Sequence, residues 1–364
     1  MKIKDIQNAL NGQYTEREEV VEGLMVAMIA RQHALLIGPP GTGKSALVSD
    51  LTKRFTGANY FQWLLTRFST PEELFGPVSL KELEQGVYKR NTTGKLPEAH
   101  TSFLDEIFKA NSSILNALLT LINERMFYND GAPGQVPLMS LIGSSNEYPE
   151  EGEGLEALFD RFLLRYEVDY IGEDQSFISM LKGSASSTAD MSIDELFELQ
   201  FFSDTVTIPD EVFEALSKIR RELMDEGIRP SDRRFKQILS VIRAKAVLAG
   251  RDYAELEDLI ILKHSLWEKP EQRDKTAKIV RNHAQDAVKT RVEEIEIEAA
   301  DILKGLEQSN NSTDMAVEST KKLKSLVSEL KKLQKDNPNR PEVEQVIALV
   351  QKSLTDIASQ VLGV

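Results

Sequence analysis

The segment GPPGTGKS, residues 38–45, matches the pattern G-x-x-x-x-G-K-[ST] in full. Glycines at these positions let backbone N–H groups converge on phosphates, Lys44 can reach the β- and γ-phosphate oxygens, and Ser45 offers a hydroxyl to Mg²⁺. The apolar run Ala34–Ile37 precedes the segment and a helical pattern follows it. The competing interpretation is a Gly/Pro turn followed by a helix, but a chance match to the full pattern with these flanks is rare. The sequence therefore predicts a nucleotide-phosphate site made by Gly38, Pro39, Pro40, Gly41, Thr42, Gly43, Lys44, Ser45 and Ala46.

Two further apolar runs end in side chains that could complete such a site. SFLDE ends in Asp105, which would hold Mg²⁺, and Glu106, which could polarise an attacking water. The competing interpretation is that this acidic pair caps the next helix. LMSLIGSSN ends in Asn146, a polar group placed to orient the same water, although an ordinary loop asparagine would look the same.

An arginine at a helix–strand junction is the remaining candidate. In LEALFDRFLLRY, residues 155–166, Arg161 ends an amphipathic helix just before an apolar run of strand length. A cation there also stabilises the helix macrodipole, which is the competing explanation for its presence. Arg165 is an alternative, but it lies inside the strand pattern.

The elements that must position these residues alternate up to about Gly183. Short apolar runs are separated by helical patterns, an order that predicts a parallel sheet with helices on both faces. The runs are Ala34–Ile37, Ser102–Leu104, Leu138–Ser144 and Phe162–Val168.

Beyond the predicted sheet, helical patterns alone remain. KGSASSTADMS, residues 182–192, is small and polar and is typical of a linker. From there to about Trp267 the pattern is helical, with Pro209 at a helix start and Gly227 and Gly250 at helix ends.

The C-terminal part predicts about three helices, with breaks near residues 309–313 and 337–341. Apolar stripes in residues 321–335 and 343–361 suggest an antiparallel helical hairpin packed on a third helix. We therefore expect three parts, at residues 1–183, 192–268 and 270–364.

These motifs, in this order, resemble the AAA+ ATPases and more narrowly their MoxR family. The resemblance is carried by GPPGTGKS, RFSTPEELFGPVSL, FLDEIFKANSSILNALLTLINER, SNEYP and LEALFDRF, and PSDRRF fits the family's helical lid. It implies an α/β fold, with a P-loop AAA+ core, an all-helical lid and a C-terminal helical bundle. Within the family the chain is most similar to the RavA subfamily, but the short loops after Pro270 leave no room for that subfamily's β-rich inserted domain.

The resemblance also implies roles for the residues of the core. Lys44 and Ser45 correspond to the Walker A motif, Asp105 and Glu106 to Walker B, and Asn146 to sensor 1. The cofactors implied are ATP and Mg²⁺.

Two arginine roles are implied in the same way. Arg161 corresponds to the arginine finger, which in AAA+ rings reaches the γ-phosphate held by the neighbouring subunit and counters charge in the transition state. Arg233 corresponds to sensor 2, with Arg234 as the alternative. A finger of this kind implies a homo-oligomer, a hexameric ring in this family.

The resemblance further implies a chaperone-like remodeller of protein complexes. Its usual partner carries a von Willebrand factor A domain, and the sequence does not name the protein client. The segment Phe75–Glu98 would hold hairpins that face the ring pore, and Tyr14, Glu16 and Arg17 would border the adenine.

Composition narrows the remaining choices. The net charge of −14 disfavours a nucleic-acid binder, and the absence of cysteine excludes disulfides and thiol catalysis. No apolar stretch is long enough to cross a bilayer and the first residues lack a signal peptide's apolar core, so we expect a cytoplasmic protein without a membrane partner. Two alternatives remain open: a DNA-dependent motor of the same fold, and an assembly scaffold that ATP binding alone would gate.

Overall fold

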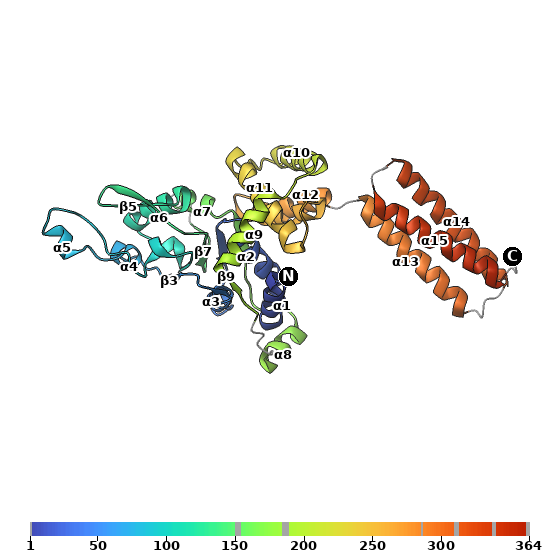
Figure 1. Ribbon diagram of the computed structural model, residues 1–364, viewed down its shortest axis with the longest axis horizontal. Helices are drawn as coiled ribbons and strands as arrows, with labels where there is room; N and C mark the ends of the chain where they lie inside the picture. Colours follow the sequence, from blue (N-terminus) through green and yellow to red (C-terminus); the bar gives the residue numbers. More distant parts are fainter. Residues whose placement is uncertain are drawn as a thin grey trace. The chain divides into compact units, whose positions relative to one another are not determined.

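The computed structural model describes residues 2–149, 154–183, 189–284, 287–308, 313–336 and 340–361. The chain divides into two compact units, Met1–Ala284 and Gln285–Val364 (Figure 1). Each unit has apolar clusters of its own.

A five-stranded parallel sheet forms the centre of the first unit. Its strand order is β3-β4-β7-β1-β8, so the first long strand lies between two strands that come more than a hundred residues later. The register pairs Leu36 with Ser144 on one side and with Tyr166 on the other. The carboxyl ends of all five strands meet at one edge, where open parallel sheets bind ligands. The strands are β1 (Ala34–Ile37), β3 (Tyr60–Leu64), β4 (Thr101–Asp105), β7 (Ser140–Ser145) and β8 (Leu164–Glu167).

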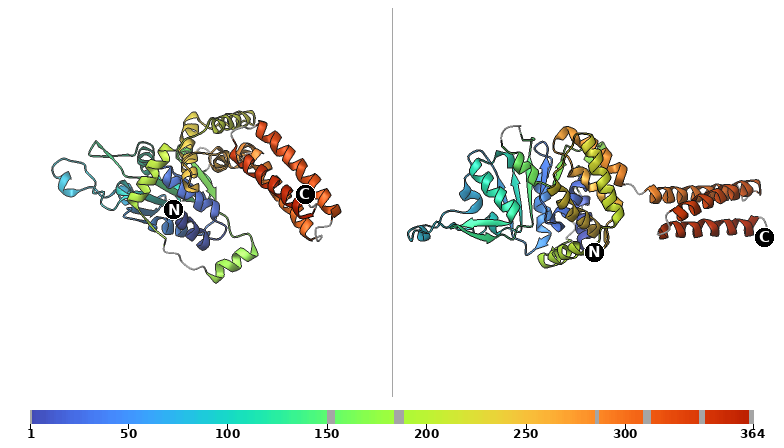
Figure 2. Two further views of the ribbon diagram at one scale, coloured as in Figure 1. Left: turned by 45° about the vertical axis from the view of Figure 1, so that its right-hand side comes forward. Right: turned by 90° about the horizontal axis from the view of Figure 1, so that it is seen from above.

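Both faces of this sheet are buried, because successive side chains of a strand point to opposite faces. Leu36 and Ile142 belong to one apolar cluster, and Leu35 and Leu141 to the other. Helices cover each face (Figure 2), which confirms the predicted α/β class. On the first face lie α1 (Lys2–Gln13), α2 (Glu18–Ile29) and α3 (Lys44–Lys53); on the second lie α4 (Pro71–Phe75), α6 (Ser112–Glu124) and α7 (Glu156–Arg161).

The sheet has one strand more than the sequence predicts. β3 forms an edge of the sheet and exposes Gln62 and Leu64, so it lacks the unbroken apolar run that marked the other four. The prediction also missed the antiparallel hairpin of β5 (Met126–Asn129) and β6 (Ala132–Gln135), whose second strand contains a proline. Short helical turns complete this region: α5 (Leu80–Leu83), η1 (Leu96–Glu98) and η2 (Ile107–Lys109).

The expected linker at residues 182–192 is partly structured. α8 (Asp174–Lys182) ends where the linker was expected to begin, and residues 184–188 lie outside the described residues. β9 (Met191–Ser192) pairs with β2 (Phe55–Thr56), because the Met191 side chain is buried in the core and Ser192 caps the next helix.

Helices follow, as predicted, from Ile193 onward. Pro209 directly precedes a helix, and Gly250 ends one with a φ of 89°, a left-handed conformation that favours glycine. The last helix of this set, α12 (Arg273–Ala284), packs on the 3-10 helix η3 (Leu256–His264) and belongs to the unit Met1–Ala284. The expected division had assigned it to residues 270–364. The set comprises α9 (Ile193–Thr205), α10 (Asp210–Asp225), α11 (Asp232–Ala249), η3 (Leu256–His264), η4 (Pro270–Gln272) and α12 (Arg273–Ala284).

The second unit contains three helices, α13 (Ala287–Gln308), α14 (Thr313–Asp336) and α15 (Pro341–Val361). They share one apolar cluster, which includes Ile295 from α13, Leu330 from α14 and Val350 from α15. The predicted three helices are therefore confirmed, and so are their apolar stripes as far as Ile357. The side chain of Val361, at the end of the second stripe, and residues 309–312 and 337–339, at the predicted breaks, lie outside the described residues.

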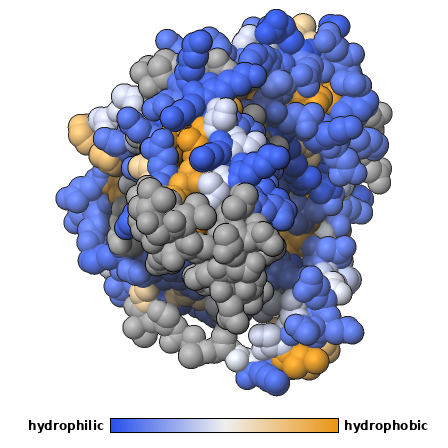
Figure 3. All heavy atoms as spheres, turned by 90° about the vertical axis from the view of Figure 1, so that its right-hand side faces the viewer, coloured by the Kyte–Doolittle hydropathy of each residue, from blue (hydrophilic) through white to orange (hydrophobic). Residues whose placement is uncertain are grey.

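The surface is mainly hydrophilic over the face drawn in Figure 3, with separate small apolar patches. One apolar helix face stands out in the first unit: α8 buries none of its residues and exposes Phe177, Ile178 and Leu181. Among the helices that the structure describes, none combines the length and the apolar character needed to cross a membrane.

Candidate nucleotide site

The predicted phosphate loop joins β1 to α3 at the carboxyl edge of the sheet. Gly41 and Gly43 have φ angles of 81° and 83°, and a Cβ atom on either would meet nothing within 4 Å. Gly38 is different, because a Cβ there would lie 2.1 Å from the carbonyl oxygen of Val168. Glycine is thus required by backbone conformation at two positions and by close packing at a third.

A pocket of about 420 Å³ opens beside this loop. It brings together side chains from the loop, from the end of β4 and from the end of β7. Gly38 and Pro39 are not part of its lining; their carbonyl groups instead hold the Lys44 side chain. The lining residues are Pro40, Gly41, Thr42, Gly43, Lys44, Ser45, Ala46, Asp105, Glu106 and Asn146.

Lys44 is the buried cation of this pocket. Its Nζ donates to the carbonyl oxygens of Gly38 at 2.6 Å and Pro39 at 2.8 Å. Burial lowers the pKa of Lys44, while the nearby charges of Asp105 and Glu106 act in the opposite direction. The ammonium group therefore rests on neutral acceptors, which an anion in the pocket could replace.

The two acidic residues at the end of β4 differ in their surroundings. Asp105 accepts a hydrogen bond from the Ser144 hydroxyl and another, at 3.1 Å, from the backbone N–H of Glu106. The Glu106 carboxylate accepts a hydrogen bond from the Asn146 amide and lies 3.2 Å from the Lys109 ammonium. Asn146 is thus directly joined to Glu106, and Lys109, which sequence reasoning missed, holds the second carboxylate oxygen.

The residues that line the pocket fit the phosphates of a nucleoside triphosphate with Mg²⁺. The first turn of α3 offers backbone N–H groups that have no partner inside the helix, which is the general basis of phosphate binding at helix N-termini. Ser45 and Asp105 supply a hydroxyl and a carboxylate, the oxygen ligands that Mg²⁺ takes when phosphates provide the rest of its shell.

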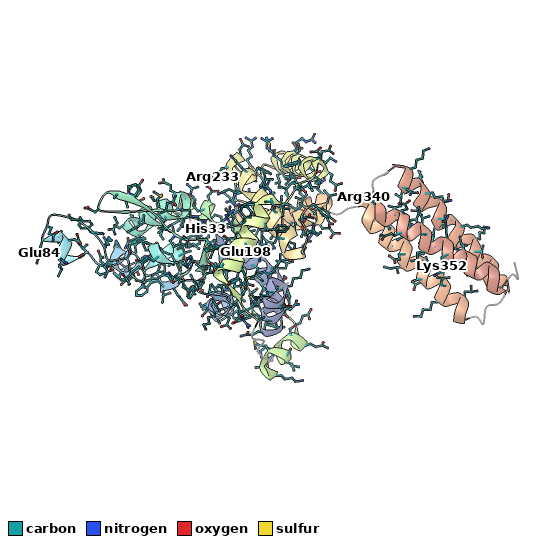
Figure 4. The ribbon with its side chains drawn as sticks, in the orientation of Figure 1. His33, Glu84, Glu198, Arg233, Arg340 and Lys352 are labelled. Atoms are coloured by element: carbon teal, nitrogen blue, oxygen red, sulfur yellow. The ribbon has the colours of Figure 1, made fainter. Side chains whose placement is uncertain are left out.

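Arg161 and Arg233 lie outside this pocket. Arg161 ends α7 with its Nη1 3.2 Å from Asp160. Arg233, in the first turn of α11 (labelled in Figure 4), has its Nη2 2.7 Å from the same carboxylate. Neither side chain lines the pocket of its own chain. The structure brings these two arginines to each other, and not to the residues of the phosphate loop.

Comparison with known proteins identifies the family. Residues 1–200 match the family described as "MoxR domain in the MoxR-vWA-beta-propeller ternary systems", and residues 211–280 match an AAA lid domain. The chain belongs to the MoxR family of AAA+ ATPases.

Relatives and a solved structure agree with this family. Two uncharacterized proteins of Methanocaldococcus jannaschii are 42% identical over 73% of this chain and 70% of theirs, and 38% identical over 92% and 83%. The chaperone MoxR1 of Mycobacterium tuberculosis is 25% identical over 72% of this chain and 74% of its own. A crystal structure from Cytophaga hutchinsonii has the same fold, with a TM-score of 0.61 and 19% identity over 77% of this chain and 92% of that one.

The two alternative arginines are buried in this MoxR-family chain. Arg165 donates to the carbonyl oxygens of Phe162 and Trp267, and its guanidinium lies 4.1 Å from the centre of the Phe159 ring. Arg234 donates to the carbonyl oxygens of Leu163 and Ser265. Both side chains hold α7, β8 and the lid helices together, so Arg161 and Arg233 are the accessible members of each pair.

The expected adenine contacts surround the loop that follows β8. Glu16 accepts hydrogen bonds from the N–H groups of Gly172 at 2.8 Å and Glu173 at 3.1 Å, and Arg17 donates to the carbonyl of Asp169. Tyr14 donates instead to Asp50 of α3, at 2.5 Å.

The expected hairpin segment, Phe75–Glu98, carries α5 in a loop closed by an antiparallel bridge between Val78 and Arg90. Glu84 marks its far end in Figure 4, and Leu80 is 75% exposed. The side chain of Asn129, in β5, accepts a hydrogen bond from the Arg90 N–H at 2.7 Å and donates to the Arg90 carbonyl at 3.0 Å. The segment and the β5–β6 hairpin are therefore joined side by side.

Proposed function

We propose that this MoxR-family chain hydrolyses ATP at the interfaces of a ring of identical subunits and uses the cycle to remodel a protein complex. The observation that carries the proposal is the shared pocket of Lys44, Asp105, Glu106 and Asn146 beside the phosphate loop. A cytoplasmic location and a hexameric ring are parts of the same proposal.

Each side chain has a part in the reaction. The loop N–H groups and Lys44 bind the phosphates, and Lys44 exchanges the carbonyl groups of Gly38 and Pro39 for phosphate oxygens. Ser45 and Asp105 would hold Mg²⁺, which neutralises charge on the phosphates when bound.

The Glu106 carboxylate would orient the attacking water and accept its proton. One oxygen of this carboxylate is held by Asn146 and the other by Lys109, which fixes its direction within the pocket. Such fixed positioning is what catalysis of phosphoryl transfer chiefly requires.

The proposed subunit interface follows from the position of the arginine finger, Arg161. Among the residues that line the pocket, Lys44 is the one cation, and Arg161 and Arg233 are directed to Asp160 elsewhere on the surface. A second copy would therefore supply an arginine to the transferred phosphoryl group, which can raise the rate by about 10³–10⁵.

The description of the matching family and the name of a relative support a partner protein. The matching family description names a vWA and a beta-propeller protein beside the MoxR domain, and a relative is named a chaperone. We therefore propose a von Willebrand factor A-domain protein as partner of the chain. The three helices α13–α15 are the proposed docking unit.

Glu106→Gln tests the proposal, because the amide keeps the shape of the side chain but cannot accept a proton. We expect ATP binding to remain and turnover to fall by about 10²–10⁴. Size-exclusion chromatography with ATP should show a ring, and this variant, expressed in its native host, should retain a vWA-domain protein that mass spectrometry identifies. Glu198→Gln, at an exposed position on α9, is the matched control and should behave as the wild type (Figure 4).

Three outcomes would contradict the proposal. Wild-type turnover in Glu106→Gln would remove Glu106 from the reaction. If the protein stays monomeric at all ATP and protein concentrations, hydrolysis at a subunit interface is refuted. Recovery of nuclease-sensitive DNA in place of a protein partner would indicate a DNA-dependent motor.

A further inference from the structure

One carboxylate in the first unit faces three guanidinium groups. Asp160, next to last in α7, has its Oδ2 3.2 Å from Arg161 and 2.7 Å from Arg233, and its Oδ1 3.0 Å from Arg234. Arg233 and Arg234 lie on α11, more than seventy residues farther along the chain. Three positive charges thus face one negative charge, and the cluster carries a net charge of +2.

The two carboxylate oxygens serve different partners. Oδ1 binds Arg234, whose side chain is 3% exposed and also donates to the carbonyl oxygens of Asp160, Leu163 and Ser265. Oδ2 binds Arg161 and Arg233, whose side chains are 22% and 44% exposed. Arg234 therefore has several acceptors besides the carboxylate. The contacts described for Arg161 and Arg233 give each of them Oδ2 alone as an acceptor.

We propose that Asp160 is a positioning residue, whose Oδ2 holds Arg161 and Arg233 together and directs both toward the nucleotide phosphates of a neighbouring copy. This inference rests on the proposed function, in which Arg161 acts on the ATP of the next subunit. It adds the residue that keeps the finger in place before that ATP arrives.

Electrostatics explains why a carboxylate is needed. Arg161 and Arg233 repel each other, and burial together with the charge of Arg233 lowers the pKa of Arg161. Without an anion between them, the two side chains would separate into different rotamers. A single carboxylate shared among three arginines holds them without cancelling their charge, so a phosphate still meets a net positive site.

Asp160→Asn separates this role from a structural one. The amide has one acceptor oxygen where the carboxylate has two, so it can serve Arg234 or the Arg161–Arg233 pair but not both, and it carries no charge. Arg234 keeps its three carbonyl acceptors whichever way the amide turns. We therefore expect a folded variant with misplaced fingers.

The first experiment compares Asp160→Asn, Asp160→Glu, Arg161→Ala and the wild type. Asp160→Asn should bind ATP and melt cooperatively, with KM nearly unchanged and kcat lower by about a hundredfold, the effect of misplacing a catalytic group. Asp160→Glu, which restores the charge, should recover part of kcat. Asp225→Asn, an exposed aspartate at the end of α10, is the matched control and should match the wild type. If Asp160→Asn lowers the melting temperature but leaves kcat per folded molecule unchanged, the inference is wrong.

Mixed rings decide whether Asp160 acts on the neighbour's site. Asp160→Asn subunits keep an intact pocket, and Glu106→Gln subunits keep intact fingers, so their mixture contains interfaces with both parts intact. We expect turnover well above that of either variant alone, and the same for Arg161→Ala mixed with Glu106→Gln.

The outcomes separate the two proposals. If the Arg161→Ala mixture recovers and the Asp160→Asn mixture does not, the proposed function stands and the role of Asp160 is refuted. If Arg161→Ala alone turns over ATP normally, the interfacial mechanism itself fails, whatever Asp160 does.

Discussion

Glu106 has a backbone conformation that few side chains adopt. Its φ and ψ are 53° and 47°, in the left-handed region, which costs a non-glycine residue about 1–3 kcal/mol. The chain turns here directly from β4 into η2, and the turn directs the carboxylate to Asn146 and Lys109. A glycine would remove the strain and with it the carboxylate. The strain at Glu106 therefore accompanies the group on which the proposed chemistry depends.

Glu19 predicts a pH dependence of stability. Hydrogen bonds from His264 and Lys263 of η3 lower the pKa of Glu19 on α2 from 4.5 to about 2. Because the folded pKa is the lower one, the contribution of Glu19 is complete above pH 4.5 and is lost as the pH falls toward 2. Urea unfolding should show the free-energy difference between wild type and Glu19→Gln shrinking across this window.

The neighbouring residue supplies the control for this measurement. Glu18 is exposed on the same turn of α2, and the contacts described for this chain give its carboxylate no such hydrogen bonds. The difference in unfolding free energy between wild type and Glu18→Gln should stay small. A difference for Glu19→Gln that does not change between pH 6 and pH 2.5 would contradict the prediction.

At the scale of elements, the contact between α2 and β8 gives a second prediction. A Cβ atom on Gly23 would lie 1.8 Å from the hydroxyl oxygen of Tyr166, whose side chain is buried in the core. Gly23→Ala should therefore destabilise the protein by about 1–3 kcal/mol, the usual cost of overpacking. Gly12→Ala, in α1 with nothing within 4 Å, should stabilise it by about 0.5–1 kcal/mol, because alanine favours a helix.

Thermal or urea unfolding of the two variants measures both effects. Both substitutions replace a helical glycine by alanine, so opposite signs isolate the steric contact from helix propensity. Equal effects would mean that α2 shifts on the sheet to accommodate the methyl group.

The sequence could predict elements whose apolar pattern was complete. Each residue of β1 is buried, and its four-residue run was predicted with the bounds that the structure has. β3 was missed because an edge strand exposes part of its side chains, and β6 because it contains a proline. A turn signal for the β5–β6 hairpin was nevertheless present in Asn129–Gly131, since Asn and Gly favour tight turns between strands.

The candidate site divides in the same way. The pocket residues could be predicted because their spacing follows from a loop after one strand and the ends of two others. The Asp160 cluster could not, because it depends on α11 packing against α7, seventy residues apart in the sequence. Lys109 also escaped notice, although its spacing of three residues from Glu106 is short.

At the scale of the whole molecule, separate cores predict separate folding. The apolar clusters of Met1–Ala284 and of Gln285–Val364 share no residue. We therefore expect the fragment 1–284 to fold cooperatively and bind ATP as the full chain does, and the fragment 285–364 to melt as an independent helical unit. Circular dichroism and nucleotide titration of both fragments test this.

A different division supplies the control. A fragment ending at residue 268 lacks α12, which packs on η3 and α10 and buries Ile279 and Val280, so it should be less stable than 1–284. Failure of the fragment 1–284 to unfold cooperatively would show that the two units depend on each other.

The hydrogen bonds between Asn129 and Arg90 also have a mechanical consequence. They clamp the segment that carries α5 to the β5–β6 hairpin, and each of these two parts returns to the sheet by its own path, one through η1 to β4 and the other through α6. A force applied at the exposed end of α5 is thus divided between two segments of the same chain, which together are stiffer than either segment alone. One of those paths, α6, leads back to the turn at Glu106, so we expect a force on α5 to reach the carboxylate proposed for catalysis.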